Sequence, residues 1–138
     1  MVFPFFADPN NLEKITPPWL NFRIDTPGPI QMTVGQKIDY KLRLHGMPIS
    51  WQSEITAWEP PYRFVDEQRR GPYRQWIHEH RFEESDNGTL VHDRVDYAVL
   101  GGDLVNKLFV LPDLRRVFTF RHDFLRNEFD SQTAHNSV

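Results

Sequence analysis

Hydrophobic and polar residues alternate with a period of two through most of the chain between residues 36 and 99. This period is typical of strands that bury one face and expose the other. Turns rich in glycine and proline divide the region into expected strands at 36–45, 49–57, 63–70, 73–83 and 89–99. The Asn87-Gly88 pair between the last two is a strong hairpin signal. Consecutive strands joined by short turns predict an antiparallel meander.

The residues after this meander follow a helical period instead. Pro112 suits the first turn of a helix, where its missing N–H costs no hydrogen bond. Hydrophobic residues then recur at spacings of three, four and seven, as on one face of a helix: Leu114, Val117, Phe118, Phe124, Leu125 and Phe129. We expect a first helical segment at 103–111 and a polar, disordered tail at 131–138.

The segment before the meander combines several short signals. Asp8 or Asn10 is expected to cap a short helix, because both side chains accept hydrogen bonds from the free amides of a first turn. Pro17-Pro18 ends that helix. Trp19 is expected to fill part of the core, and a short strand is expected at 20–24.

These elements predict an α+β domain with a curved antiparallel sheet wrapped around a long C-terminal helix, preceded by short N-terminal helical segments. A single amphipathic helix buries its apolar face by lying across the sheet. A twisted sheet does not contact one helix everywhere, so we expect a cavity between the two layers. One domain is expected to span residues 1–130.

The composition narrows the class of protein. Of the 138 residues, 39% are hydrophobic and 25% are charged, as in soluble globular domains. The net charge of −3 disfavours nucleic-acid binding, because no positive field surrounds the chain. The absence of cysteine excludes disulfides and thiolate metal sites. We see no signal peptide and no apolar run of about 20 residues, so a cytoplasmic protein without stable membrane insertion is expected.

Polar residues occupy positions where the strands are expected to face the cavity. Asp66 and Gln68 lie on one strand, His78 and His80 on the next, and Asp93 on the third. Adjacent antiparallel strands bring such residues within reach of one another, and buried charges require partners. Large aromatic residues are expected to line the cavity around this polar patch: Trp51, Trp76, Phe82, Tyr97 and Phe118.

The polar patch admits several interpretations. It can be a structural network that sets strand register, a recognition site for the polar head of a ligand, or a His/Asp pair for acid–base catalysis. The His-x-His pair can also join Asp66 or Asp93 in a three-ligand metal site, although one such pair is a weak signal. Arg121 is expected to pair with an inner carboxylate such as Asp93. Three other histidines are expected at the surface: His45, His92 and His122.

Three segments carry a family resemblance: FFADPNNLEKITPPWLNF (5–22), HGMPISWQSEITAWEPPYRFVDEQRRGPYRQWIHEHRF (45–82) and DRVDYAV (93–99). They resemble a bacterial ligand-binding subgroup of the SRPBCC superfamily, the START-like or helix-grip proteins that include polyketide cyclase/dehydrase-like members. The resemblance implies a helix-grip fold with a cavity for a hydrophobic ligand, and no established reaction for this subgroup. Such proteins normally have a strand before the first helical segment. This chain begins at the helical segment, so we expect either that its start is short or that this strand is absent, which leaves the edge of the last strand exposed.

We therefore predict that the chain binds a small hydrophobic or amphipathic molecule, lipid-like or polyketide-like, through the polar patch and the aromatic residues around it. The alternative is a cyclase- or dehydratase-type enzyme that uses a His/Asp pair in the same cavity. A third possibility is an interaction module whose pocket is filled by its own side chains. We predict no cofactor, no metal and no nucleic-acid partner, and the sequence leaves the oligomeric state open.

Overall fold

Seven strands of the described residues form one sheet. The computed structural model describes residues 2–26, 30–86, 88–99, 106, 110–129 and 133–137. The strands are β1 (Arg23–Ile24), β2 (Lys37–Leu44), β3 (Met47–Glu59), β4 (Arg63–Arg70), β5 (Gln75–Ser85), β6 (Gly88–Ala98) and β7 (Thr133–Ser137). Their order in the sheet follows the chain, with β1 to β6 antiparallel and β7 parallel to β6. The predicted antiparallel meander is confirmed.

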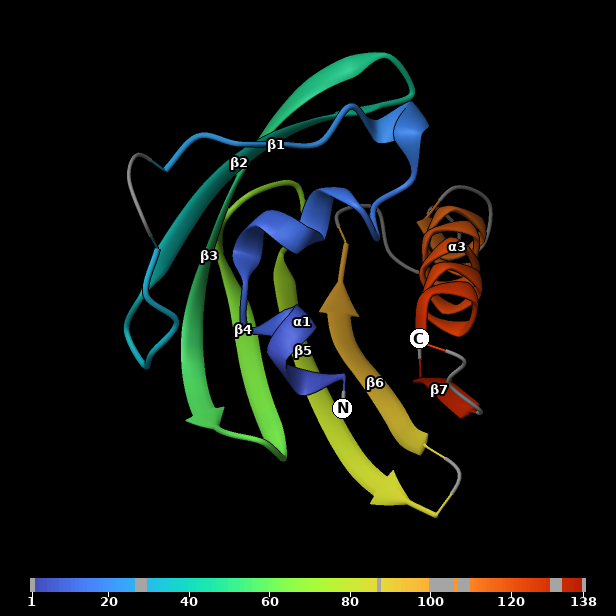
Figure 1. Cartoon of the computed structure of the whole chain (residues 1–138). Coiled ribbons are helices and arrows are strands. Elements are labelled where there is room, and N and C mark those ends of the chain that lie inside the picture. The colour runs from blue at the N-terminus through green and yellow to red at the C-terminus, as the bar shows by residue number, and fades with distance from the viewer. Residues whose placement is uncertain are drawn as a thin grey trace.

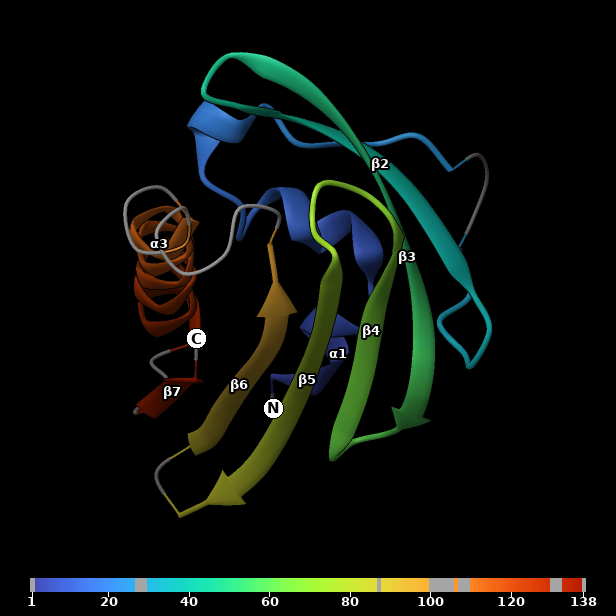
Figure 2. The same cartoon turned by 180° about the vertical axis from the view of Figure 1, so that it is seen from behind.

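The sheet is curved, and most buried residues of its strands lie on the concave face. Figures 1 and 2 show the long strands bending around the N-terminal segment. In β3 the pairing with β4 shifts register between Gln52 and Ser53, and again between Ile55 and Ala57. Such bulges increase the local bend and twist of a strand. Ser53 and Ile55 are both buried, as the period of two predicts for one face.

One long helix, α3 (Leu111–Phe129), follows β6 in the chain and lies beside the β6 end of the curved sheet (Figure 1). Leu114, Phe118 and Leu125 are buried at spacings of four and seven, which confirms the predicted apolar face of the helix at these positions. The burial of Phe129 lies outside what the structure describes. The ring of Phe118 meets the ring of His78 on β5 edge to face, with centroids 5.5 Å apart. The helical segment expected at 103–111 lies mostly outside the described residues.

The N-terminal segment lies within the concave side of the sheet (Figure 1). It forms α1 (Phe3–Phe6) and two 3-10 helices, η1 (Pro9–Glu13) and η2 (Pro18–Leu20). Asp8 caps η1 by accepting a hydrogen bond of 3.0 Å from the backbone N–H of Asn10. The expected cap is therefore confirmed, and its helix is a 3-10 helix.

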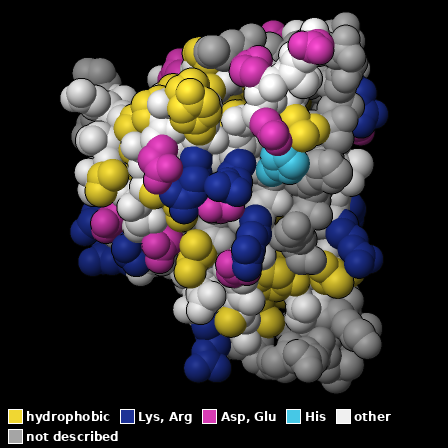
Figure 3. Space-filling view, turned by 90° about the horizontal axis from the view of Figure 1, so that it is seen from below, with side chains coloured by type: hydrophobic (Ala, Val, Ile, Leu, Met, Phe, Trp, Pro, Cys, Tyr) yellow, Lys and Arg dark blue, Asp and Glu magenta, His cyan; other side chains and the backbone are white. Residues whose placement is uncertain are grey.

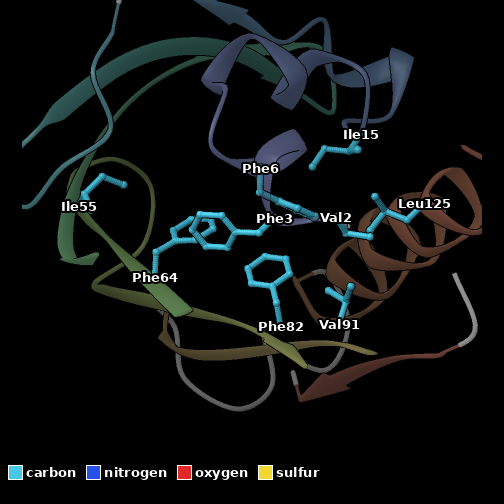
Figure 4. Packing of buried hydrophobic residues seen from close by; sticks show 9 residues of the cluster. All are labelled: Val2, Phe3, Phe6, Ile15, Ile55, Phe64, Phe82, Val91 and Leu125. Atoms are coloured by element: carbon cyan, nitrogen blue, oxygen red, sulfur yellow. The ribbon is translucent and has the colours of Figure 1, made fainter. Parts of the chain in front are cut away.

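The hydrophobic core joins α1 to the strands and to α3. The rings of Phe3 and Phe6 lie 5.1 to 6.5 Å from those of Phe64 and Phe82. Figure 4 shows these rings together, with Leu125 approaching from α3. Burying each phenylalanine contributes roughly 1.5–3 kcal/mol, so this cluster holds the N-terminal segment against the sheet.

The structure differs from the sequence-based expectation around η2. The strand expected at 20–24 is shortened to β1, because the turn of η2 continues to Leu20 and Asn21 then adopts a left-handed conformation, with φ of 48°. Trp19 does not fill the core, which corrects our prediction. Its side chain is 56% exposed and contacts Phe120 edge-on, with ring centroids 6.1 Å apart.

The C-terminal residues also differ from expectation. We expected a disordered tail at 131–138, whereas the backbone of Thr133–Ser137 forms β7 beside residues 90–94 of β6. A strand edge offers unpaired N–H and C=O groups to any nearby extended backbone. That edge of β6 is therefore paired, in place of the exposed edge that the resemblance implied.

The surface carries charges of both signs. Figure 3 shows basic and acidic side chains interspersed on one face, with hydrophobic side chains between them. Opposite charges also pair across strands, as in the 2.8 Å contact between Arg63 and Glu79. No helix in the described ranges is long and apolar enough to cross a membrane.

Candidate functional site

A cavity of about 440 Å³ lies between the concave face of the sheet, the N-terminal segment and α3. Small-molecule sites commonly have volumes of roughly 300 to 1,000 Å³, so this pocket is not filled by its own side chains. Much of its lining is apolar or aromatic, including Trp19, Leu20, Tyr40, Trp51, Trp76, Leu114 and Val117. An ionisable group of side chains interrupts this lining: Asp66, His78, His80 and Arg121.

We call this ionisable group the polar wall of the cavity, and His78 and His80 form its centre. They point to the same side of β5 because they are two residues apart, and their rings stack with centroids 3.7 Å apart. His78 donates from Nε2–H to Asp93 Oδ1 at 2.8 Å. His80 donates from Nε2–H to Asp66 Oδ2 at 2.7 Å. The stacked rings therefore lie between a carboxylate of β4 and a carboxylate of β6.

The remaining ring nitrogens of this pair face the opposite carboxylates at longer range. His78 Nδ1 lies 4.0 Å from Asp66 Oδ2, and His80 Nδ1 lies 3.4 Å from Asp93 Oδ1. His80 Nδ1 is buried and has no hydrogen-bond partner among the described residues. Asp66 lines the cavity, whereas Asp93 lies behind the two rings, with its side chain 0% exposed. The cluster therefore has one edge toward the cavity and one toward the interior.

Burial and pairing shift the pKa values in this cluster. Burial raises the pKa of Asp93, but the hydrogen bond from His78 and the nearby positive charges outweigh this effect, so the pKa lies below its ordinary value. The pKa of Asp66 is lowered in the same way, chiefly through His80. Burial, together with the charge of His78, lowers the pKa of His80 to about 4. At pH 7 two ionised carboxylates therefore flank a neutral His80.

Arg121 reaches the cavity from α3. It is 9% exposed, and its guanidinium carbon lies 5.1 Å from the centroid of the Phe118 ring. Within the described part of the chain, its Nε and Nη1 atoms have no hydrogen-bond partner. The direct pair expected between Arg121 and Asp93 is therefore not formed through these atoms, although the charge of Arg121 helps to lower the pKa of Asp93.

In the aromatic wall of the cavity, formed by Tyr40, Trp51 and Trp76, the polar atoms of Tyr40 and Trp51 have hydrogen-bond partners. Trp51 donates from Nε1–H to Ser53 Oγ at 3.0 Å, and the Ser53 hydroxyl shares a 2.8 Å hydrogen bond with the Tyr40 hydroxyl. Burial raises the pKa of Tyr40 well above its ordinary value. The ring of Tyr40 stacks on Trp51, and Trp76 meets Trp51 edge-on, with centroids 5.3 Å apart. Because these polar atoms are paired with each other, the wall presents mainly aromatic surface to the cavity.

Comparison with known proteins places this architecture in a family. The family model described as polyketide cyclase / dehydrase and lipid transport matches residues 1–122. The chain belongs to this family. The family resemblance inferred from the sequence is thereby confirmed.

The fold of this member of the polyketide cyclase / dehydrase and lipid transport family is shared with a solved structure. Protein Ms6760 from Mycobacterium smegmatis superposes with a TM-score of 0.61 at 18% sequence identity, over 91% of this chain and 80% of that one. At this identity the similarity supports the α+β helix-grip fold alone. A comparison with curated proteins finds no match.

The ten predicted binding residues divide into two groups by position. The first group lines the cavity of this family member: Trp51, Asp66, Trp76, His78 and His80. The second group lies outside the lining: Gln68, Phe82, Asp93, Tyr97 and Phe118. Ligand binding by either group stays a prediction.

The residues outside the lining have identifiable partners. Gln68 accepts a hydrogen bond from the backbone N–H of Tyr73 and donates one to its carbonyl, at 3.0 and 2.7 Å, which closes the turn between β4 and β5. Phe82 lies in the core. Tyr97 donates to Asn106 Oδ1 at 2.6 Å. These contacts support the cavity from behind, as Asp93 supports the two histidines.

Several lining residues were absent from the predicted site. Tyr40 alternates with Ile38 and Leu42 on the inner face of β2, so the period of two already pointed to it. Arg121 and Val117 lie on the apolar face of α3, and their approach to the sheet depends on tertiary packing that periodicity does not describe.

Of the three histidines predicted at the surface, two are exposed or partly exposed and one is largely buried. The His45 side chain is 61% exposed, as expected, and its Nε2 lies 2.7 Å from Asp113 Oδ2 at the cavity lining. The His92 side chain is 34% exposed. The prediction for His122 was wrong, since its side chain is only 15% exposed and its Nε2 lies 3.9 Å from Asp93 Oδ2. Its position on α3, next to Arg121, brings it to the interior.

Proposed function

We propose that this chain binds a small hydrophobic or amphipathic molecule, lipid-like or polyketide-like, in the cavity between the sheet and α3. The observation that carries the proposal is the cavity of about 440 Å³, lined by aromatic and aliphatic side chains and closed on one side by ionisable groups. Family membership supports it, because the family description includes lipid transport.

The binding mode follows from the two kinds of wall. The apolar body of the ligand lies against Trp51 and Trp76, where removal of its surface from water stabilises the complex by about 25 cal/mol per Å² before the costs of association. A polar group of the ligand contacts the wall of Asp66, His78 and His80. Hydrogen bonds from this polar group replace the hydrogen bonds to water that these side chains lose when the ligand binds.

Substitution of one residue of α3 tests the proposal. Val117 lines the cavity, and Val117→Trp places an indole in the space that the ligand needs. The exposed Thr119 lies two residues away on the same helix, so Thr119→Trp is the matched control. We expect saturable binding of decan-1-ol or 2-naphthol by calorimetry, weakened at least about tenfold, or roughly 1.4 kcal/mol, in Val117→Trp only. Absence of binding to the unaltered protein, or equal binding by both variants, contradicts the proposal.

A second candidate is a cyclase- or dehydratase-type enzyme acting in the same cavity. Two imidazole–carboxylate pairs support it, because a carboxylate that holds an imidazole in one orientation is a common arrangement for proton transfer. This candidate requires turnover of a carbonyl substrate that His78→Ala abolishes while the substrate still binds. Binding without turnover in the unaltered protein favours the first function.

A further inference from the structure

We propose that Asp66, His78 and His80 bind a divalent transition-metal ion, such as Zn²⁺, at the polar wall of the cavity. One ligand atom from each of these residues lies within 4.8 Å of the other two. Two imidazoles and one carboxylate are ligands that Zn²⁺ and related ions accept together. This inference does not rest on the proposed organic ligand.

The geometry favours the cavity edge of the cluster. Asp66 Oδ2 lies 2.7 Å from His80 Nε2 and 4.0 Å from His78 Nδ1. An ion about 2.1 Å from each ligand atom separates those atoms by roughly 3 to 3.5 Å in octahedral or tetrahedral coordination. The two observed distances bracket this value. Binding of one ion also requires the two imidazole rings, which stack with centroids 3.7 Å apart, to rotate until the in-plane lone pair of each ligand nitrogen points at the ion.

Asp93 completes the arrangement from the interior side. Metal-bound histidines usually donate their other ring N–H to a carboxylate or carbonyl, which fixes the ring and its tautomer. His78 already donates from Nε2 to Asp93 Oδ1 at 2.8 Å. When His80 binds the ion through Nε2, its proton lies on Nδ1, 3.4 Å from the same Oδ1. This assigns a donor role to His80 Nδ1, which has no hydrogen-bond partner in the described part of the chain.

Charge and access also suit a cation at this place. The Asp93 side chain is 0% exposed and that of Asp66 is 18% exposed, and buried carboxylates need compensating positive charge. The nearby guanidinium of Arg121 supplies one positive charge to the two carboxylates, so a bound cation compensates the other. All three proposed ligand residues line the cavity, so the coordination positions that the protein does not fill face the cavity. Three protein ligands with open positions are typical of metal sites that bind or activate a small molecule.

Titration with the metal alone tests the site. Protein freed of metal by EDTA and then of EDTA is titrated with ZnCl₂ by calorimetry at pH 7. We expect one ion per chain, and no binding of Mg²⁺, which prefers oxygen ligands. In long-range ¹H–¹⁵N spectra of the unaltered protein, we expect the ring-nitrogen signals of two histidines to shift on addition of Zn²⁺. In the His78→Ala and His80→Ala variants, the signal of the replaced histidine is expected to be missing from the signals that shift.

Variants separate this site from adventitious binding by other histidines. Asp66→Asn and the double variant His78→Ala/His80→Ala are expected to weaken binding by roughly 100-fold or more. Asp93→Asn is expected to weaken it by roughly 10- to 100-fold, and His92→Ala leaves it unchanged. If the double variant does not fold, Asp66→Asn and the spectra of the unaltered protein decide. Absence of Zn²⁺ binding, equal binding by Asp66→Asn, or shifts confined to other histidines overturns the proposal.

Discussion

Replacement of Phe118 by alanine tests whether α3 packs on the sheet as described. Phe118 is 1% exposed, contacts His78 edge-on and lies under the guanidinium of Arg121. Truncation of a buried phenylalanine to alanine costs about 3–5 kcal/mol, because apolar contacts are lost and a cavity remains. The lost cation–π contact, about 0.5–2 kcal/mol, falls within that range. We therefore expect a loss near 4 kcal/mol.

Equilibrium unfolding in urea measures this loss. With a slope of about 2 kcal/mol per molar urea for a domain of this size, the midpoint falls by roughly 2 M. Phe118→Leu retains much of the buried volume and is expected to cost less than half as much. Thr119→Ala changes the exposed neighbour on the same helix and is expected to stay within about 0.5 kcal/mol of the unaltered protein. A loss below about 1 kcal/mol for Phe118→Ala refutes the described packing.

Two further predictions concern turn closure and the aromatic wall. A Cβ added at Gly71 would lie 2.5 Å from Gln68 Oε1, so Gly71→Ala is expected to lower the free energy of unfolding by about 1–3 kcal/mol. The double variant Gly71→Ala/Gln68→Ala removes that contact and serves as the comparison. An unchanged melting temperature of Gly71→Ala in a thermal melt contradicts the predicted crowding. Burial raises the pKa values of Tyr40 and Tyr73, so their stabilising contribution is complete below pH 10 and is lost as the pH rises further. Absorbance at 295 nm should show that these two phenols ionise only when the chain unfolds, with Tyr40→Phe/Tyr73→Phe as the control; their ionisation near pH 10 in the folded protein contradicts the burial.

Much of the sheet follows directly from the sequence because its signal is local. The alternation around Val91, Asp93 and Val95 needs only a strand with one buried face, and all three residues are buried. The same periodicity placed His78 and His80 on the inner face, and strand order placed Asp66 and Asp93 on either side of them. Family resemblance supplied the helix-grip arrangement.

The remaining differences depend on contacts between distant segments. Trp19 is as hydrophobic as a core residue, but the η2 turn leaves it largely exposed beside Phe120. Gln68 has the alternation of an inner residue, yet a nearby backbone binds both ends of its amide. His122 on α3 is only 15% exposed, and its Nε2 lies 3.9 Å from Asp93 Oδ2 on β6. Periodicity assigns a face to each residue, whereas the partner that a side chain meets depends on tertiary packing.

The indole N–H signals of the four tryptophans give the most direct test of ligand binding in the cavity. Trp19, Trp51 and Trp76 line the cavity, whereas Trp58 packs against Phe3 and Phe64 in the core. On titration of ¹⁵N-labelled protein with decan-1-ol, the signals of Trp51 and Trp76 are expected to shift saturably while that of Trp58 stays in place. An absence of shifts, or equal shifts in all four signals, contradicts binding in this cavity.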